Sequence, residues 1–565
     1  MFTLVDYCVF GCVITLCLFI GIYFGFWKKS KTADEYLLGN RSMSVAPISI
    51  SLVTSHISGL TILGLPSDVY VYGANSVWIC LAIVVASIIG YFVFLPTLVN
   101  LKRPNVYEYL HLRFDRRIQV IASCLYTIQV LCYCPVVAYI PAIAFSQATM
   151  VNPHIITPIV CAVCVFYTTI GGFKAVVWTH AIQFLGTITA VTAVFVLGIL
   201  SVGGVDAILE KSLKTDRLDF NFSIDPTKRD GFWQMVIGCM ATWLYNITFQ
   251  PGTVQKYISL STFKRVKVVM FLQCCGLVLI HLLCVFSGII MYAQYEDCDP
   301  LSTGEVTRLD QIVPFFVMDV GRDITGLPGI FIAGTFCAAL SSLSSTFNTL
   351  SATVYGDFIT TFIPKKTIGD KETLILKLIV VISGCICTSL TFFVDRVGGL
   401  LAFVNASMGF GCGIQIGLFT LGVIFSMSNA KGAFFGAVAA FFGVGPVMVL
   451  NQWYTLKGAG ESFAKPVSIE GCEIPVNITL PKTLFEQEQP FVLFRFSFWY
   501  NPVMSALVVT LVGLLVSYFT KNKMHIANPN LQKNDEEMNL PGLPSTTRKS
   551  ILKGYSNHRI QGTKM

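Results

Sequence analysis

Apolar residues recur along the chain in blocks of about 20 residues or more, separated by short polar stretches, from Met1 to Thr520. A helix needs about 20 apolar residues to cross the hydrocarbon core of a bilayer. Blocks this long and uniform predict helices, because only helices and closed barrels satisfy their backbone polar groups in lipid. The pattern predicts an all-α polytopic membrane protein with thirteen spans, at approximately 4–27, 45–72, 76–100, 117–146, 153–174, 178–203, 231–255, 264–293, 326–360, 373–395, 398–426, 431–451 and 498–520.

The composition agrees with this prediction. Of the 565 residues, 54% are hydrophobic and only 12% are charged, whereas soluble globular proteins carry about 25% charged residues. A soluble enzyme is therefore excluded, and the lipid bilayer is an expected partner. The net charge of +8 does not indicate nucleic-acid binding, because in a membrane protein the side on which the basic residues lie carries the information.

The basic residues predict the orientation. With the N-terminus outside, 27 of the 39 Lys and Arg residues fall in inner segments, and the other 12 lie mostly in two long outer loops. Because basic residues favour the cytoplasmic side, we expect the N-terminus outside and the C-terminus inside. Residues 1–520 then form the transmembrane domain, and the polar stretch 521–565 is predicted to be a disordered cytoplasmic tail.

Two further signals fall in segments assigned to the outside. Asn221 and Asn477 each begin an Asn-X-Ser/Thr sequence, so both are predicted glycosylation sites. Cys298 and Cys472 are the two cysteines outside the predicted spans, and an oxidising compartment would allow them to form a disulfide. The sequence leaves this pairing open, because it does not show that the two cysteines lie close together.

The second predicted span is unusually polar at its centre, where His56 and Gly59 lie. Its hydroxyl residues are Ser49, Ser51, Thr54, Ser55, Ser58 and Thr61. Polar groups inside a membrane are costly and usually face a cavity or a partner. The centre is therefore predicted to break the helix and to release backbone carbonyl oxygens. The alternative is that the hydroxyls bond to their own helix and that His56 is a core residue.

The ninth predicted span carries small and hydroxylated residues on one helical face, at Ala338, Ser341, Ser342, Ser345 and Asn348. Such a stripe also occurs where helices pack closely. However, it supplies many neutral oxygens, which are the ligands that a hard cation such as Na⁺ prefers. We therefore predict a cation site between the second and ninth spans.

The seventh predicted span runs through Trp243, Tyr245 and Asn246 to Pro251 and Gly252. The Pro-Gly pair predicts a second interrupted helix. Counted from the second span, the seventh begins a second set of five helices. Interrupted helices at corresponding positions of two halves indicate a transporter built from inverted repeats.

With these features the sequence resembles the sodium/solute symporter family, and within it the branch of sodium-coupled monocarboxylate, multivitamin and iodide transporters. The resembling stretches run in family order over nearly the whole chain before residue 521. They are 34–43 (DEYLLGNRSM), 62–70 (ILGLPSDVY), 171–179 (GGFKAVVWT), 254–257 (VQKY), 297–300 (DCDP), 326–329 (GLPG) and the serine-rich face described above.

The resemblance implies a LeuT-type core of two inverted five-helix repeats, at 45–203 and 231–426, flanked by helices at 4–27, 431–451 and 498–520. It implies a symporter rather than an enzyme, with sodium as the co-transported ion. The implied main sodium site consists of backbone oxygens of Thr54, Ile57 and Ala338 and the hydroxyls of Ser341 and Ser342. A second sodium would lie near Ser344, Ser345 and Asn348. The implied substrate residues are Ser55, His56, Ser58, Gly59 and Thr61, facing Trp243, Tyr245 and Asn246.

Three positions depart from the family pattern. His56 replaces an aromatic residue, Gln or Asn; His180 replaces the Asp of the usual Trp-Thr-Asp; and Gln250-Pro251 replaces Asn-Gln. No Lys or Arg lies in the middle of a predicted span, so an anion would be held by helix ends, hydroxyls, amides and Na⁺. We expect His56 to bind the carboxylate of the substrate.

The resulting prediction is a plasma-membrane, sodium-coupled symporter that imports a small organic monoanion by alternating access. The monoanion is a monocarboxylate or a vitamin-like carboxylate, with iodide as a further candidate. Two alternatives remain open. One is a non-transporting sensor or channel-like protein on the same fold, and the other is a proton-coupled carrier, which the two unusual histidines favour.

Overall fold

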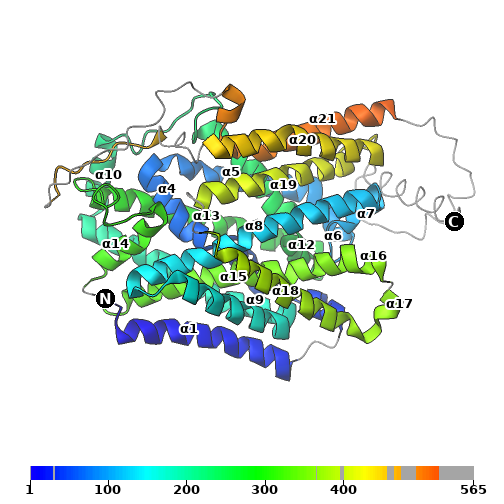
Figure 1. Ribbon diagram of the computed structural model, residues 1–565, viewed down its shortest axis with the longest axis horizontal. Helices are drawn as coiled ribbons and strands as arrows, with labels where there is room; N and C mark the ends of the chain where they lie inside the picture. Colours follow the sequence, from blue (N-terminus) through cyan, green and yellow to red (C-terminus); the bar gives the residue numbers. More distant parts are fainter. Residues whose placement is uncertain are drawn as a thin grey trace, which may run out of the picture.

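Helices account for nearly all the regular structure of the chain, and most of the long ones run along the same direction in Figure 1. The computed structural model describes residues 2–28, 32–322, 324–363, 365–394, 400–454, 463–472 and 491–520. These described residues contain no β-strand. Asn477 and the predicted tail 521–565 lie outside the described residues.

The helices alternate between long membrane-sized segments and short connecting ones. They are α1 (Leu4–Ile22), α2 (Ala33–Leu38), α3 (Val45–His56), α4 (Leu65–Tyr72), α5 (Ile79–Ile89), α6 (Leu95–Asn100), α7 (Glu108–Arg113), α8 (Arg116–Thr149), α9 (Pro153–Val202), α10 (Val205–Lys214), α11 (Met240–Leu244), α12 (Pro251–Ile258), α13 (Phe263–Gln294), α14 (Ile312–Val320), α15 (Leu327–Val354), α16 (Thr360–Phe362), α17 (Lys365–Ile368), α18 (Glu372–Thr391), α19 (Leu400–Val423), α20 (Ala430–Tyr454) and α21 (Asn501–Phe519).

Within the described residues, 10 helices are long and apolar enough to cross a membrane, or up to 11 if one bent pair counts as a span. Two features separate this number from the thirteen predicted spans. Helix α9 covers two predicted blocks, and its backbone leaves the helical conformation at Gly172, where φ is +59° and ψ is −157°. The predicted block 231–255 consists of short helical pieces, each of which is too short to cross a membrane by itself. Thirteen spans therefore stays a prediction.

Gly172 is required at the interruption of α9. A positive φ is costly for residues with a side chain. A Cβ atom at this position would also lie 2.6 Å from the ring of Tyr36. Because a straight helix of 50 residues would be about 75 Å long, more than twice the hydrocarbon thickness of about 30 Å, the interruption allows α9 to supply two shorter segments.

The second predicted span is broken where its sequence is rich in Ser and Gly. Helix α3 ends at His56, and Ile57 is extended, with φ −99° and ψ 113°. The chain returns to helix at Leu60 and continues through α4, whose direction differs from that of α3 by 57°. In the seventh predicted span, Gln250 is extended with φ −60° and ψ 124°, directly before Pro251 begins α12. Both predicted interruptions are present.

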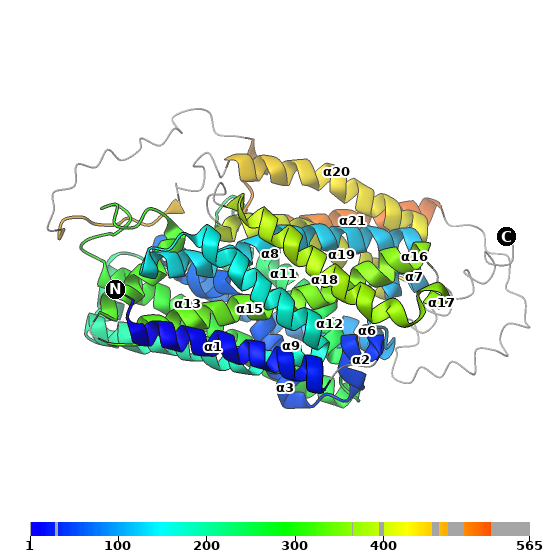
Figure 2. The same cartoon turned by 60° about the horizontal axis from the view of Figure 1, so that its bottom comes forward.

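Helix α15, which carries the serine-rich face, is the most enclosed of the long helices. Almost all of its residues are buried, and it packs against α9, α8 and α1. Figures 1 and 2 both show it inside the bundle rather than at its edge. This position explains why its face is small and polar: the residues meet other helices and not lipid.

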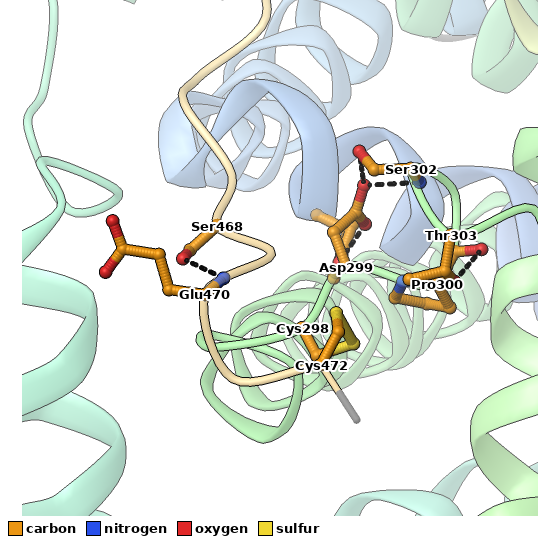
Figure 3. The surroundings of a disulfide bond; sticks show 9 residues. Cys298, Asp299, Pro300, Ser302, Thr303, Ser468, Glu470 and Cys472 are labelled. Carbon is orange, nitrogen blue, oxygen red and sulfur yellow. Dashed lines mark hydrogen bonds between the residues drawn. A yellow bond between two sulfur atoms is a disulfide. The ribbon is translucent and has the colours of Figure 1, made fainter. Parts of the chain in front are cut away.

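The two ends of the bundle differ. The start of α1 lies at the same end as α10 and α14, whereas α7, α16 and α17 lie at the opposite end (Figure 1). At the first end, Cys298 and Cys472 form a disulfide (Figure 3). The pairing that the sequence left open is therefore present. It ties the segment 463–472 to the chain that follows α13.

The same segment is also fixed to the end of α4. The backbone N–H of Lys465 donates to the carbonyl oxygen of Val71 at 2.9 Å. Arg217, which is fully buried, donates to the carbonyl oxygens of Tyr70 and Val71 and, at 2.7 Å, to that of Pro466. A cation at a helix C-terminus is favourable, because the last carbonyls there lack helical partners. These contacts hold the end of the broken helix in place.

Candidate functional site

A cluster of oxygens forms where α15 passes the end of α3. The Ser341 hydroxyl lies 3.0 Å from the carbonyl oxygen of Thr54 and 2.9 Å from that of Ala338. The Ser342 hydroxyl lies 3.1 Å from the Ala338 oxygen and 3.3 Å from the carbonyl oxygen of Ile57. All five residues of the implied main sodium site thus meet in one place.

The break in the helix makes this cluster. Carbonyls in the last turn of a helix lack the partners that a continuing helix would give them, so the end of α3 exposes oxygens to α15. The cluster contains one oxygen that the sequence did not assign to it, the carbonyl of Ser55, which lies 3.4 Å from the Ser342 hydroxyl. The sequence could have indicated this oxygen, because Ser55 lies in the last turn of α3 together with Thr54.

The side-chain hydroxyls of α3 behave differently. Ser49, Thr54 and Ser55 each bond to a carbonyl three or four residues earlier in their own helix. The alternative interpretation is therefore correct for these three hydroxyls. The backbone of α3, and not its side-chain hydroxyls, supplies the oxygens that face α15.

Ser345 does not join the oxygen cluster. Its side-chain oxygen lies 3.6 Å from the position that a Cβ on Gly252 would occupy, so it faces the start of α12. The prediction that Ser345 binds sodium remains a prediction, and its place in the structure separates it from Ser341 and Ser342.

A cavity of about 150 Å³ lies beside the cluster. Six of the eight implied substrate residues line it: Ser55, His56, Ser58, Thr61, Trp243 and Asn246. Gly59 and Tyr245 do not. Gly59 contacts α8, where an added Cβ would lie 3.1 Å from Ile140, and Tyr245 is buried in the core. The other lining residues with polar side chains are Asp68, Ser76, Tyr133, Thr242, Gln250, His281, Thr346 and Asn405, together with Trp499.

His56 is held firmly at the wall of this cavity. Its Nδ1 lies 2.7 Å from the carbonyl oxygen of Leu52, and its Nε2 lies 3.1 Å from that of Asn246 and 3.2 Å from the Thr253 hydroxyl. A neutral ring that donates from Nδ1 to the Leu52 carbonyl leaves Nε2 unprotonated, so Nε2 can accept from the Thr253 hydroxyl but forms no hydrogen bond with the Asn246 carbonyl oxygen. Its ring centroid lies 6.2 Å from that of Trp243. Polar groups on both interrupted helices thus fix the imidazole.

His281 is a cavity residue that the sequence analysis missed. It lies on α13, its Nδ1 is 2.8 Å from the carbonyl oxygen of Leu277, and its ring meets Trp243 edge-on at 5.2 Å. An ionisable residue inside an apolar block is a functional signal, and His281 lies in the middle of the predicted span 264–293.

Asp68 brings a buried ion pair to another part of the wall. The Arg229 guanidinium lies 2.6 Å from Asp68 and 2.8 Å from Asp230, and its central carbon lies 3.5 Å from the centre of the Tyr72 ring. Trp499, which also lines the cavity, donates from its indole nitrogen to Asp230 at 2.9 Å. At this part of the wall one guanidinium is thus shared by two carboxylates, and no basic side chain that the structure describes there is left without an acidic partner.

Residues 36–440 match the sodium:solute symporter family. The chain belongs to this family. It is 32% identical to human sodium-coupled monocarboxylate transporter 2 over 531 residues, which cover 92% of this chain and 84% of the relative. It is 33% identical both to sodium-coupled monocarboxylate transporter 1 of Xenopus laevis, covering 91% and 85%, and to a putative sodium-dependent multivitamin transporter of Drosophila melanogaster, covering 91% and 86%.

The fold agrees with that of a Na⁺-coupled symporter of known structure. A solved structure of a Na⁺-coupled sialic acid symporter superposes with a TM-score of 0.73 at 20% identity, covering 92% of this chain and 98% of the other. The family membership makes this protein a sodium-coupled symporter rather than an enzyme, with sodium as the co-transported ion. It is a multi-pass membrane protein, as its apolar helices predict.

Proposed function

We propose that this symporter imports a small organic monoanion together with sodium across the plasma membrane, by alternating access. The preferred substrates are monocarboxylates or vitamin-like carboxylates, with iodide as a further candidate. The relatives named for sodium-coupled monocarboxylate and multivitamin transport support this class. The proposed arrangement has thirteen spans and two five-helix repeats. Its orientation, with the N-terminus outside and the C-terminus inside, rests on the distribution of basic residues.

One observation carries the proposal. Ser55 belongs both to the oxygen cluster, through its carbonyl oxygen, and to the wall of the cavity. A cation bound by Ser341 and Ser342 would therefore pull on the residue that shapes the substrate pocket. Binding of the two species is then linked through the short segment that breaks the helix, which is what symport requires.

The cavity suits an anion without offering it a free cationic side chain. Ser58 and Thr61 stand at the start of the helical run Leu60–Tyr72, and the N-terminal end of a helix attracts negative charge. We propose that the substrate carboxylate lies there, with Asn246 as a further polar contact, and that His56 donates to it from a protonated Nε2. The sodium ion on the other side of Ser55 adds positive charge.

Uptake measurements test this proposal. Cells that express the full-length chain would be given labelled lactate, pyruvate, biotin or iodide, with sodium or with choline in the medium. Accumulation that requires sodium is the expected result. A current evoked by one of these solutes without accumulation would instead identify a sensor or channel, and uptake in sodium-free acidic medium would identify a proton-coupled carrier.

A further inference from the structure

A lysine lies buried one helical turn from the oxygen cluster. Lys256 belongs to α12 and is 2% exposed, and its ammonium donates to the carbonyl oxygen of Ser51 at 3.1 Å. It directly follows the predicted span 231–255 and is one of the 27 basic residues assigned to inner segments, and this position gave no sign of its burial. In the described part of the chain it has no carboxylate within ion-pair distance. A buried ammonium with only neutral partners is costly to maintain, so it needs an explanation.

His180 also contacts Ser51, through the side chain rather than the backbone of that serine. It belongs to α9 and is fully buried, and its Nδ1 lies 2.8 Å from the Ser51 hydroxyl. Its Nε2 lies 3.2 Å from the Ser344 hydroxyl. With a hydroxyl on each nitrogen, a neutral imidazole has both of its partners. Ser51 thus joins the amino group of Lys256 to the imidazole of His180, and the group carries one positive charge when Lys256 is protonated.

This group lies where a second cation was predicted. Ser344 was one of the implied ligands of that cation, but the Ser344 hydroxyl contacts His180 and the carbonyl oxygen of Ser341. Ser51 precedes Thr54 by three residues on α3, and Ser344 follows Ser341 by three on α15. Residues three apart on a helix are neighbours on one face, so the charge of Lys256 is held next to the oxygen cluster.

We propose that Lys256 and His180 take the place of a second sodium ion, so that the protein binds one Na⁺ per chain. This inference rests on the proposed sodium site at Ser341 and Ser342. The ammonium supplies the positive charge that a second Na⁺ would bring, and it repels another cation from Ser344. Transport of one Na⁺ with one monoanion then moves no net charge.

Equilibrium binding of radiolabelled sodium to the purified full-length protein tests the stoichiometry without requiring a known substrate. The wild type is expected to saturate at one Na⁺ per chain, and the double variant Ser341→Ala/Ser342→Ala is expected to lose that binding. If the wild type shows no saturable sodium binding, the proposed function itself fails. If it binds two ions, only the present inference is overturned.

Charge-changing variants sharpen the test. In Lys256→Gln/His180→Asp the group carries one negative charge, and binding is expected to rise to two Na⁺ per chain. In either single variant the group is neutral, so one Na⁺ per chain is expected, and these proteins serve as matched controls. A monodisperse double variant that still binds one ion contradicts the inference. If the double variant does not fold, the wild-type stoichiometry still decides.

Discussion

The guanidinium of Arg229 lies 2.6 Å from the carboxylate of Asp68, and both groups are almost completely buried. This contact joins α4, the second part of the broken helix, to the chain that leads into the seventh predicted span. Arg217 holds the end of the same helix through the carbonyl oxygens of Tyr70 and Val71. Helix α4 is therefore anchored at two places beyond the break at Ile57.

Removing one partner of this ion pair is expected to destabilise the protein. Arg229→Met leaves the buried carboxylates of Asp68 and Asp230 without their shared cation, and loss of one partner of a buried pair typically costs about 3–5 kcal/mol. Asp68→Asn leaves Arg229 paired with Asp230 and should cost less. Thermal unfolding in detergent would show the loss as a lower midpoint. Arg322→Ala is the control, because this side chain is 80% exposed and pairs with Asp319 at the surface, where a pair contributes about 1 kcal/mol or less. Equal midpoints for Arg229→Met and the wild type would contradict the expectation.

Loss of the hydroxyls of the oxygen cluster is expected to weaken sodium binding. Ser341→Ala and Ser342→Ala each remove one oxygen ligand, and we expect the sodium concentration for half-maximal uptake to rise roughly 10-fold or more, which corresponds to about 1.4 kcal/mol. Ser351→Ala is the matched control on the same helix, because its hydroxyl bonds only to the carbonyl oxygen of Asn348. A similar change in all three variants would indicate a general packing defect instead.

Substitution of His56 is expected to weaken substrate binding. His56→Phe keeps the ring but removes both nitrogens, so the KM for the transported anion should rise about 10-fold or more, as expected for the loss of a hydrogen bond to a charged group. Thr253→Val removes only the hydroxyl beside Nε2 and should give a smaller rise. Uptake that is unaffected by His56→Phe and by His56→Ala would rule out a role for this residue in binding the carboxylate.

The disulfide is expected to stabilise the end of the bundle at which it lies. Cys298→Ser should lower stability by about 2–5 kcal/mol, the usual effect of removing a native disulfide, because the segment 463–472 would lose a covalent attachment. Reduced surface expression and a lower unfolding midpoint are the measurements. Cys385→Ser changes an exposed free cysteine and should have no effect on either.

Glycosylation tests the proposed orientation. Asn221 lies between α10 and the seventh predicted span, in a segment assigned to the outside. Treatment with an N-glycosidase should shift the wild-type protein on a gel, and Asn221→Gln should remove part of that shift. No shift in the wild type or in a protein that keeps only Asn221 would argue against this side being external.

Sequence patterns were sufficient for the elements of this fold. The lengths of the apolar blocks predicted the long helices, and Ser-Gly and Pro-Gly positions predicted the interruptions near Ile57 and Gln250. These features are local: a helix breaks where its own residues fail to support it. The five residues that the family resemblance implied for the main sodium site lie together in the structure, and their binding of sodium stays a prediction.

Contacts between distant residues were not accessible in this way. The sequence did not decide whether Cys298 and Cys472 form a disulfide, and it gave no indication of His281 at the cavity. Lys256 was assigned to an inner segment, although the structure buries it. Gly59 and Tyr245 were assigned to the substrate, although one packs against α8 and the other lies in the core. A residue type indicates what a side chain is able to bind, but its direction depends on neighbours elsewhere in the chain.

The sequence by itself determined that this chain is a membrane protein with two interrupted helices and a face of small hydroxylated residues. Only the tertiary structure decided which oxygens meet. Ser341 and Thr54 are 287 residues apart, and Lys256 and His180 come together only through Ser51 on a third helix. Hydrophobic periodicity specifies the faces of each helix, whereas the partner of each face is set by packing the whole bundle at once.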